Sequence, residues 1–248
     1  YRRILRICPV FYLVLIIGYL LKDNTDGIFN YLFFLSNFEV IYNNSSQTGI
    51  LFPLWSVSIE EQYYFFVPLL FFLFRINTKH SFTIVYIILL IFSLFYQITY
   101  NDNINKLHYA TLSCITDLSI GGIVAILVFY NIRIVKYFEN LGKFKIIVFY
   151  IIGFVYILTR VYLEIYVFFR VFERCILSLF FAFIILEQSY SKKSVYKISK
   201  NKFLCSLGKY TYSMYMFHMI FLIYIHKFWV KFEIYDNLFV DLIIKTVP

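Results

Sequence analysis

The sequence predicts an all-α fold, a polytopic transmembrane helical bundle that forms one membrane domain over residues 1–248. Composition is the first observation behind this expectation: 61% of the 248 residues are hydrophobic and 23% are aromatic, whereas only 15% are charged. A soluble domain has roughly 45–50% apolar residues and needs a larger charged surface to stay dispersed. The mean hydropathy of +0.75 is the second observation and agrees with the first. The composition also excludes a disordered chain and a disulfide-rich secreted domain.

Apolar runs place seven spans along the chain, expected in order at 7–21, 62–74, 81–101, 118–132, 146–159, 175–186 and 210–226. A bilayer core about 30 Å thick needs roughly 20 largely apolar helical residues. Only the third and seventh runs are uncharged throughout and long enough as they stand. The others reach spanning length if flanking polar residues snorkel. Residues 28–38 are too short to span and are expected to be interfacial, and residues 240–247 are expected to begin an eighth span that is cut short.

Basic residues are divided unevenly between the two sets of loops that alternate across seven spans. One set carries fifteen Lys and Arg residues and consists of loops 1–6, 75–80, 133–145 and 188–209. The other set carries seven and consists of loops 22–59, 102–112, 160–174 and 227–239. The positive-inside rule places the first set, and therefore residue 1, on the cytoplasmic side. The net charge of +9 is thus explained mainly as the signal that orients the chain in the membrane, and contact with anionic lipid headgroups is a second explanation. No nucleic-acid partner is expected.

An arginine pair at the start of the first span is the first candidate site. Arg3 and Arg6 lie three residues apart, so on a helix they share a face. Two guanidinium groups on one face suit a phosphate, which arginine binds through two hydrogen bonds. A simple positive-inside anchor also explains the pair, and spacing alone favours the anchor.

Polar residues at the start of the second span form another candidate site. Ser58 and Glu61 match the S-x-x-E capping box, which explains them structurally if the helix begins at Ser58. If the helix begins a few residues earlier, Ser56, Glu60 and Tyr64 recur every four residues on one face, where they could hold a proton or orient a hydroxyl. The two alternatives place the helix start differently, and the sequence does not choose between them.

Two further residues interrupt apolar stretches. Asp117 precedes Gly121 and Gly122, and an acid near membrane depth indicates either a functional group or one that faces the protein interior. His218 lies inside the last complete span, where a lone histidine is more often structural than catalytic. No P-loop, dinucleotide fingerprint, nucleophile elbow or zinc-protease motif occurs in the sequence, and no metal site is expected.

Three stretches together resemble the acyltransferase family 3 membrane proteins, which are integral membrane O-acyltransferases of cell-surface polysaccharides. Residues 2–9 read R-R-I-L-R-I-C-P and are similar to the family's R-R-x-x-R-I-x-P. Residues 54–64 read L-W-S-V-S-I-E-E-Q-Y-Y and match its S-x-x-x-E-x-x-x-Y stretch, the most specific of the three. Residues 206–218 read S-L-G-K-Y-T-Y-S-M-Y-M-F-H and contain its Y-S-x-Y-x-x-H motif. Around Asp117 the likeness is imperfect, because Ser119 replaces the family's leucine and no arginine stands directly before the acid.

The resemblance implies that an acyl group, with acetyl-CoA as the expected donor, passes to a surface glycan or lipid-linked sugar at a bacterial inner membrane. Arg3 and Arg6 would bind the phosphates of CoA from the cytoplasm. Ser56, Glu60 and Tyr64 would line the acceptor side near the outer face, with Glu60 orienting the acceptor hydroxyl or a catalytic histidine.

The resemblance also implies about ten spans and a catalytic histidine that precedes the arginines. The sequence is therefore expected to be a fragment that lacks two earlier spans and the end of the last, and none of its histidines is expected to fill that role. Two alternatives remain: a transporter or flippase that moves a sugar-lipid or acyl substrate without group transfer, and a fragment without activity of its own.

Overall fold

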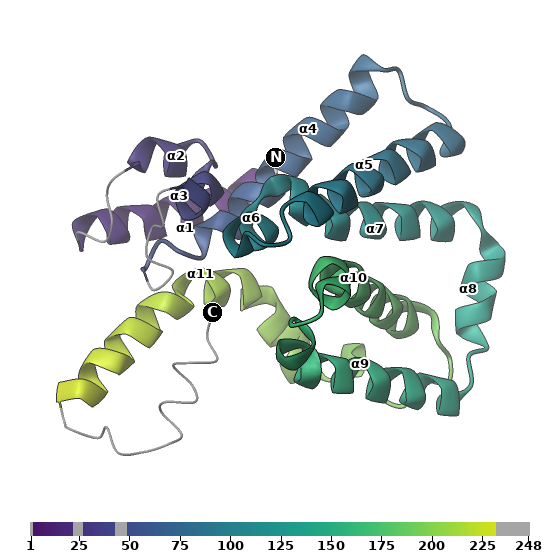
Figure 1. Cartoon of the computed structure of the whole chain (residues 1–248). Coiled ribbons are helices and arrows are strands. Elements are labelled where there is room, and N and C mark those ends of the chain that lie inside the picture. Colours follow the sequence, from purple (N-terminus) through teal and green to yellow (C-terminus); the bar gives the residue numbers. More distant parts are fainter. Residues whose placement is uncertain (1, 22–26, 43–48, 232–248) are drawn as a thin grey trace. The chain divides into compact units, whose positions relative to one another are not determined.

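The computed structural model of the chain describes residues 2–21, 27–42 and 49–231, and all regular secondary structure in these residues is helical (Figure 1). The expected all-α class is therefore confirmed. The helices are α1 (Arg2–Leu20), α2 (Ile28–Leu32), α3 (Ser36–Tyr42), α4 (Leu54–Leu73), α5 (Lys79–Thr99), α6 (Ile104–Tyr109), α7 (Thr111–Tyr130), α8 (Ile132–Glu139), α9 (Lys143–Leu163), α10 (Val167–Tyr190), the 3-10 helix η1 (Ile198–Lys200) and α11 (Lys202–Lys231).

Each of the seven predicted spans overlaps one helix of 19 residues or more, namely α1, α4, α5, α7, α9, α10 and α11. Among the described residues, four segments are long and apolar enough to cross a membrane: Arg3–Leu20, Lys79–Thr99, Ile104–Tyr130 and Lys143–Leu163. The count of seven spans stays a prediction, and the expected eighth lies outside the described residues. The expected interfacial segment forms the short helices α2 and α3.

Side-chain caps explain where several helices begin. The first backbone N–H groups of a helix have no partner within the helix, so a polar side chain just before it often accepts from one of them. Thr78 accepts from the N–H of Ser81 at the start of α5, and Asn103 accepts from the N–H of Lys106 in α6. Asn201 likewise accepts from the first turn of α11.

The helix that contains the second apolar run begins at Leu54, eight residues before that run, as in the alternative that places the helix start ahead of Ser56. The sequence stretch before residue 62 is polar, but its polar groups have partners inside the protein. The hydroxyl oxygens of Ser58 and Ser36 lie 2.7 Å apart, and both side chains are fully buried. Glu61 pairs with Arg3. These partners allow the helix to continue through residues that an apolar run alone would exclude.

The chain divides into two compact units. The first comprises residues 1–61 and 206–248, and the second comprises residues 62–205. One boundary falls within α4 and the other near the start of α11. The expectation of a single membrane domain stays a prediction.

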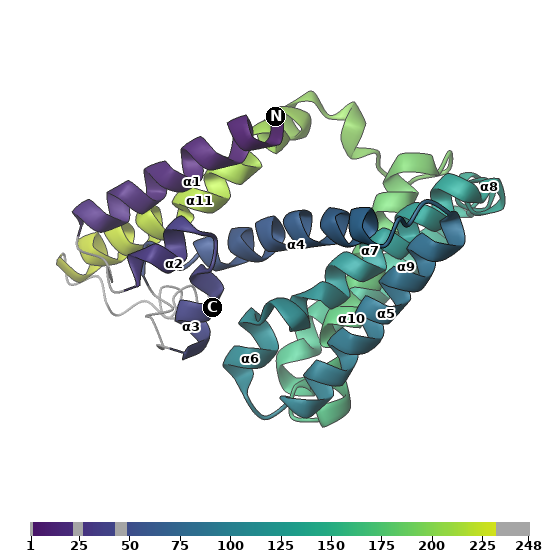
Figure 2. The ribbon, with the colours of Figure 1, turned by 90° about the horizontal axis from the view of Figure 1, so that it is seen from above.

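The first unit packs around α1. Its core includes Phe11 from α1, Leu54 from α4 and Met216 from α11, none of which is exposed. Gly18 permits close packing, because a Cβ at this position would collide with the side chain of Leu51. In Figure 2, α11 runs beside α1 in the same direction, whereas residues 54–61, the part of α4 in this unit, run in the opposite direction.

The second unit contains helix pairs held by different kinds of contact. Helices α5 and α7 share a buried polar cluster: the Ser93 hydroxyl lies 2.6 Å from that of Thr116, and the Gln97 amide donates to Thr116 at 2.7 Å. Helices α9 and α10 pack through aromatic rings, with Phe149 stacked on Phe183 at a centroid distance of 3.7 Å. Hydrogen bonds between helices are common where apolar surroundings cannot satisfy polar groups.

Candidate functional site

Three stretches that are far apart in the sequence meet in the first unit. They are residues 2–9 at the start of α1, 54–61 at the start of α4, and 206–218 in α11. Each stretch contacts both of the others through at least one side chain. The site is therefore assembled from three helices, and it depends on the packing of the unit rather than on one local motif.

The contact between the first two stretches is an ion pair. The Arg3 guanidinium donates to a carboxylate oxygen of Glu61 at 3.0 Å, and the two side chains are 35% and 25% exposed. A partly exposed pair of this kind retains moderate Coulomb attraction, because solvent screens it incompletely. Glu61 is thus a partner of Arg3, and its predicted alternative role as a capping residue is excluded by the start of α4 at Leu54.

The third stretch contacts the other two through tyrosine hydroxyls. The Tyr215 hydroxyl lies 2.6 Å from the hydroxyl of Ser56, and it also donates to the carbonyl of Pro53 at 3.3 Å. One turn earlier, the Tyr212 hydroxyl donates to the carbonyl of Ile7 in α1 at 3.2 Å. These two tyrosines are three residues apart on one side of α11, and they connect this helix to α4 and to α1.

Because α4 begins at Leu54, the structure favours the alternative in which Ser56, Glu60 and Tyr64 recur on one helix face. Ser56 is half-buried, whereas Glu60 and Tyr64 are exposed. Within the described part of the chain, the Glu60 carboxylate makes no hydrogen bond or ion pair. An exposed carboxylate beside a bound one is available to a ligand, although its role stays a prediction.

Arg6 is also available to a ligand. Its side chain is exposed, and no ion-pair partner is found for it among the described residues. It lies one helical turn from Arg3, so the face of α1 that holds the Arg3–Glu61 pair continues into a second guanidinium. The arrangement offers two guanidiniums and two carboxylates at one end of the first unit.

The Arg3–Glu61 contact contradicts the expected positions of Arg3 and Glu60 across the membrane. Arg3 and Glu60 were expected at opposite faces of the membrane, but Glu61, the next residue after Glu60, touches Arg3 at 3.0 Å. A bilayer core about 30 Å thick cannot separate groups that lie this close. The expectation failed because it assigned residues 22–59 to an outer loop, whereas residues 54–61 form two helical turns beside α1.

Comparison with known proteins identifies the family. Residues 1–246 match the family model described as an acyltransferase domain, that of acyltransferase family 3. The chain belongs to acyltransferase family 3.

Curated relatives of this acyltransferase family 3 chain come from Staphylococcus aureus strains COL, MSSA476 and MRSA252, each named "Putative O-acetyltransferase". Each is 24% identical over 259 residues. The match covers 94% of this chain and 42% of each relative, so the chain spans less than half the length of these relatives. No solved structure matches the chain.

Asp117 of this acyltransferase family 3 chain lies in the second unit, where α10 supplies its partners. The Arg174 guanidinium donates to one carboxylate oxygen of Asp117 at 2.7 Å, and the Ser178 hydroxyl donates to the other at 2.7 Å. Arg174 also donates to the carbonyl of His108. No arginine stands directly before Asp117 in the sequence, yet Arg174 reaches it from 57 residues away. Both carboxylate oxygens are therefore engaged, and Asp117 connects α7 to α10.

His218 lies in α11 beside the tyrosine contacts. Its Nδ1 contacts the carbonyl of Tyr215 one turn earlier, and its ring centroid is 5.3 Å from that of Tyr215. The contact stays within one helix, so it orients the imidazole without connecting it to the Arg3–Glu61 pair. No group of three His, Cys, Asp or Glu residues in the described ranges is placed to hold a metal ion.

Proposed function

We propose that the protein is a membrane O-acyltransferase that moves an acyl group, acetyl in the simplest case, from acyl-CoA to a hydroxyl of a cell-surface polysaccharide or lipid-linked sugar. The observation that carries the proposal is the meeting of three helices at Arg3–Glu61, Ser56–Tyr215 and Tyr212–Ile7. Family membership and the O-acetyltransferase names of the relatives support the reaction class.

The donor side of the proposed site is the arginine face of α1. Coenzyme A carries a pyrophosphate and a 3′-phosphate, and guanidiniums bind such groups by charge-assisted, paired hydrogen bonds. Arg6 is exposed and without an ion-pair partner in the described residues, so it suits a phosphate directly. Arg3 is held by Glu61 at 3.0 Å, which fixes the direction of its guanidinium before a ligand arrives. The residue types present therefore fit the phosphate end of acyl-CoA.

The acceptor side of the proposed site is the face of α4 that carries Glu60. In acyl transfer the hydroxyl oxygen forms a bond to the thioester carbonyl carbon, the carbon–sulfur bond breaks, and CoA leaves with the proton that the hydroxyl loses. The exposed Glu60 carboxylate can accept a hydrogen bond from the acceptor hydroxyl and orient it. We assign no residue of this chain as the general base.

The membrane setting follows from the sequence and the helices together. The segments in α1, α5, α6–α7 and α9 are long and apolar enough to span. The excess of basic residues in one set of loops supports a cytoplasmic position for the start of α1, as in a bacterial inner membrane. Arg3 and Arg6 would then meet acyl-CoA on the side where CoA is made.

Binding of CoA to the protein in lipid nanodiscs tests the donor site. We expect Arg6→Gln to weaken CoA binding by about tenfold or more, because it removes a charge-assisted contact worth about 1.5–3 kcal/mol. Arg75→Gln is the matched control, since Arg75 is an exposed arginine outside the proposed site. Equal CoA affinity of Arg6→Gln and the wild type would refute the assignment of the phosphate site to α1.

A further inference from the structure

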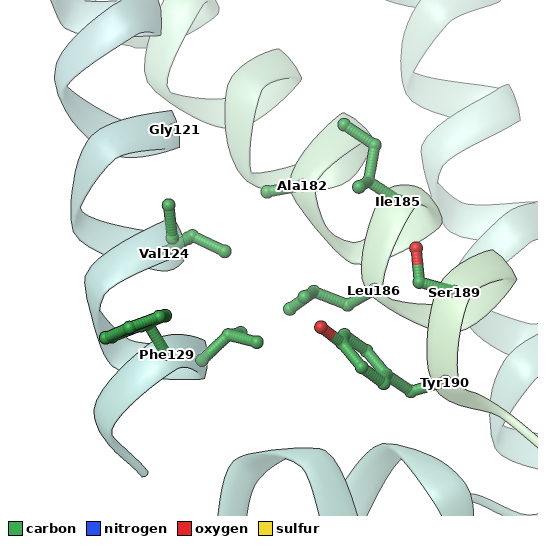
Figure 3. A pocket seen from close by; sticks show the side chains of 10 residues that line it. Gly121, Val124, Phe129, Ala182, Ile185, Leu186, Ser189 and Tyr190 are labelled. Carbon is green, nitrogen blue, oxygen red and sulfur yellow. The ribbon is translucent and has the colours of Figure 1, made fainter. Parts of the chain in front are cut away.

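A cavity between α7 and α10 in the second unit is separate from the residues used in the proposed reaction. Its volume is about 400 Å³, and Figure 3 shows side chains from both helices pointing into it. The lining residues are Gly121, Val124, Ala125, Val128, Phe129, Ala182, Ile185, Leu186, Ser189 and Tyr190. On α7 the lining extends over eight residue steps, or about 12 Å along the helix axis.

The lining indicates an apolar, elongated occupant. Eight of the ten residues have no polar side-chain atom, and the two exceptions, Ser189 and Tyr190, lie together at the end of α10. Helix α7 is part of a segment that is apolar enough to span a membrane. A cavity of this shape matches a stretch of hydrocarbon chain in its length and in its polarity.

Two adjacent glycines in α7 differ in what surrounds them, and only one of them permits contact with another helix. A Cβ on Gly122 would lie 2.5 Å from the ring of Tyr86, so that glycine permits contact with α5. A Cβ on Gly121 would meet no atom within 4 Å. Gly121 therefore leaves the cavity open without serving a contact between helices.

Basic residues follow both lining helices in the chain at the polar end of the cavity. Helix α8 follows α7 directly and carries Arg133 and Lys136, and Lys192 and Lys193 follow α10 after Tyr190. All four side chains are exposed. The two segments are joined, because the Lys192 ammonium donates to Glu139 at 3.1 Å.

The charge at this end of the cavity is strongly unbalanced. Glu139 is the one acidic residue in 131–145 and 189–209 together. Arg133, Lys136 and Lys193 have no ion-pair partner in the described part of the chain. The Tyr190 hydroxyl, which points into the cavity in Figure 3, likewise donates to no group among the residues that the structure describes.

We propose that this cavity binds one anionic membrane phospholipid, with an acyl chain between α7 and α10 and the phosphate headgroup on Arg133, Lys136 and Lys193. Charge complementarity decides the occupant, because an apolar cavity whose lining is followed within seven residues by three exposed cations without ion-pair partners suits a lipid with a negative headgroup. The Tyr190 hydroxyl is placed to donate to an ester carbonyl between the chain and the headgroup. The site does not depend on the proposed acyl transfer.

Native mass spectrometry of the protein released from nanodiscs of equal phosphatidylglycerol and phosphatidylcholine, with identical acyl chains, tests the proposal. We expect one phosphatidylglycerol to be retained, with at least tenfold preference over phosphatidylcholine. The double variant Gly121→Leu/Ala182→Leu fills the cavity and should lose the retained lipid. Gly208→Leu is the matched control, since Gly208 in α11 also has no atom within 4 Å of a Cβ and should retain the lipid.

The headgroup half of the proposal has its own variant. Arg133→Gln/Lys136→Gln/Lys193→Gln changes only exposed side chains and should leave folding intact while removing the preference for phosphatidylglycerol. Retention of phosphatidylcholine and phosphatidylglycerol in equal amounts by the wild type would overturn the anionic headgroup. Retention of phosphatidylglycerol by the filled-cavity variant at the level of the wild type would overturn the site itself.

Discussion

At the scale of single residues, the site depends on the difference between paired and unpaired charges. Glu61 and Arg3 hold each other at 3.0 Å, whereas Glu60 and Arg6 are exposed and lack partners among the described residues. A paired charge is fixed in direction, and an unpaired one is free to bind a ligand. The proposed division of work follows: Glu61 positions Arg3, Arg6 binds phosphate, and Glu60 orients a hydroxyl.

The pair between Glu61 and Arg3 predicts how substitutions of these two residues change thermal stability. Glu61→Gln and Arg3→Gln should each lower the melting temperature slightly, and the double variant should lower it by less than their sum. The coupling should be about 1 kcal/mol, because the pair is partly exposed and screened. A double-mutant cycle of thermal unfolding in detergent measures it, and strictly additive effects would show that the pair contributes nothing.

Residue-scale contacts are also where the sequence was least informative. The Asp117 carboxylate is bound by Arg174 from 57 residues away, and Ser56 meets Tyr215 from 159 residues away. Spacing along one helix cannot reveal such partners, because they depend on how helices pack. The family resemblance indicated residues 206–218 as important, but it did not indicate that their tyrosines touch α4 and α1.

At the scale of helices, hydropathy predicted the seven long elements well. Each long apolar run corresponds to a helix, because about 20 apolar residues have few other stable conformations in a membrane. Helix α4 begins eight residues before its apolar run, since hydropathy alone cannot recognise polar residues whose partners, such as Ser36 for Ser58, lie on other helices.

The polar cluster between α5 and α7 yields a prediction at this scale. Thr116→Val removes the hydroxyl that accepts from the Gln97 amide at 2.7 Å and leaves one buried N–H of that amide without a partner. We expect a loss of about 1–3 kcal/mol in the free energy of unfolding. Thr99→Val is the control, because the Thr99 hydroxyl is exposed and bonds only within α5, and its effect should stay within about 0.5 kcal/mol. Equal melting temperatures for the two variants would show that the cluster does not stabilise the pair.

At the scale of the whole molecule, the outer surface agrees with a membrane protein. Large apolar side chains such as Phe72, Phe129 and Phe144 are about four-fifths exposed, at 79%, 81% and 79%. In water such apolar surfaces would associate with one another, whereas contact with lipid tails removes that tendency. The family match extends over residues 1–246, so both units belong to the same acyltransferase sequence.

The central claim is that the arginine face of α1 serves acyl transfer. Acetyl-CoA labelled in its acetyl group, supplied to the cytoplasmic face of membrane vesicles that contain the protein and its glycan acceptor, tests it most directly. We predict that label enters the glycan fraction as an alkali-labile ester, and that Arg6→Gln lowers this incorporation at least tenfold while Arg75→Gln does not. Glycan that crosses the membrane without acquiring label, or equal incorporation by Arg6→Gln and the wild type, would contradict the claim.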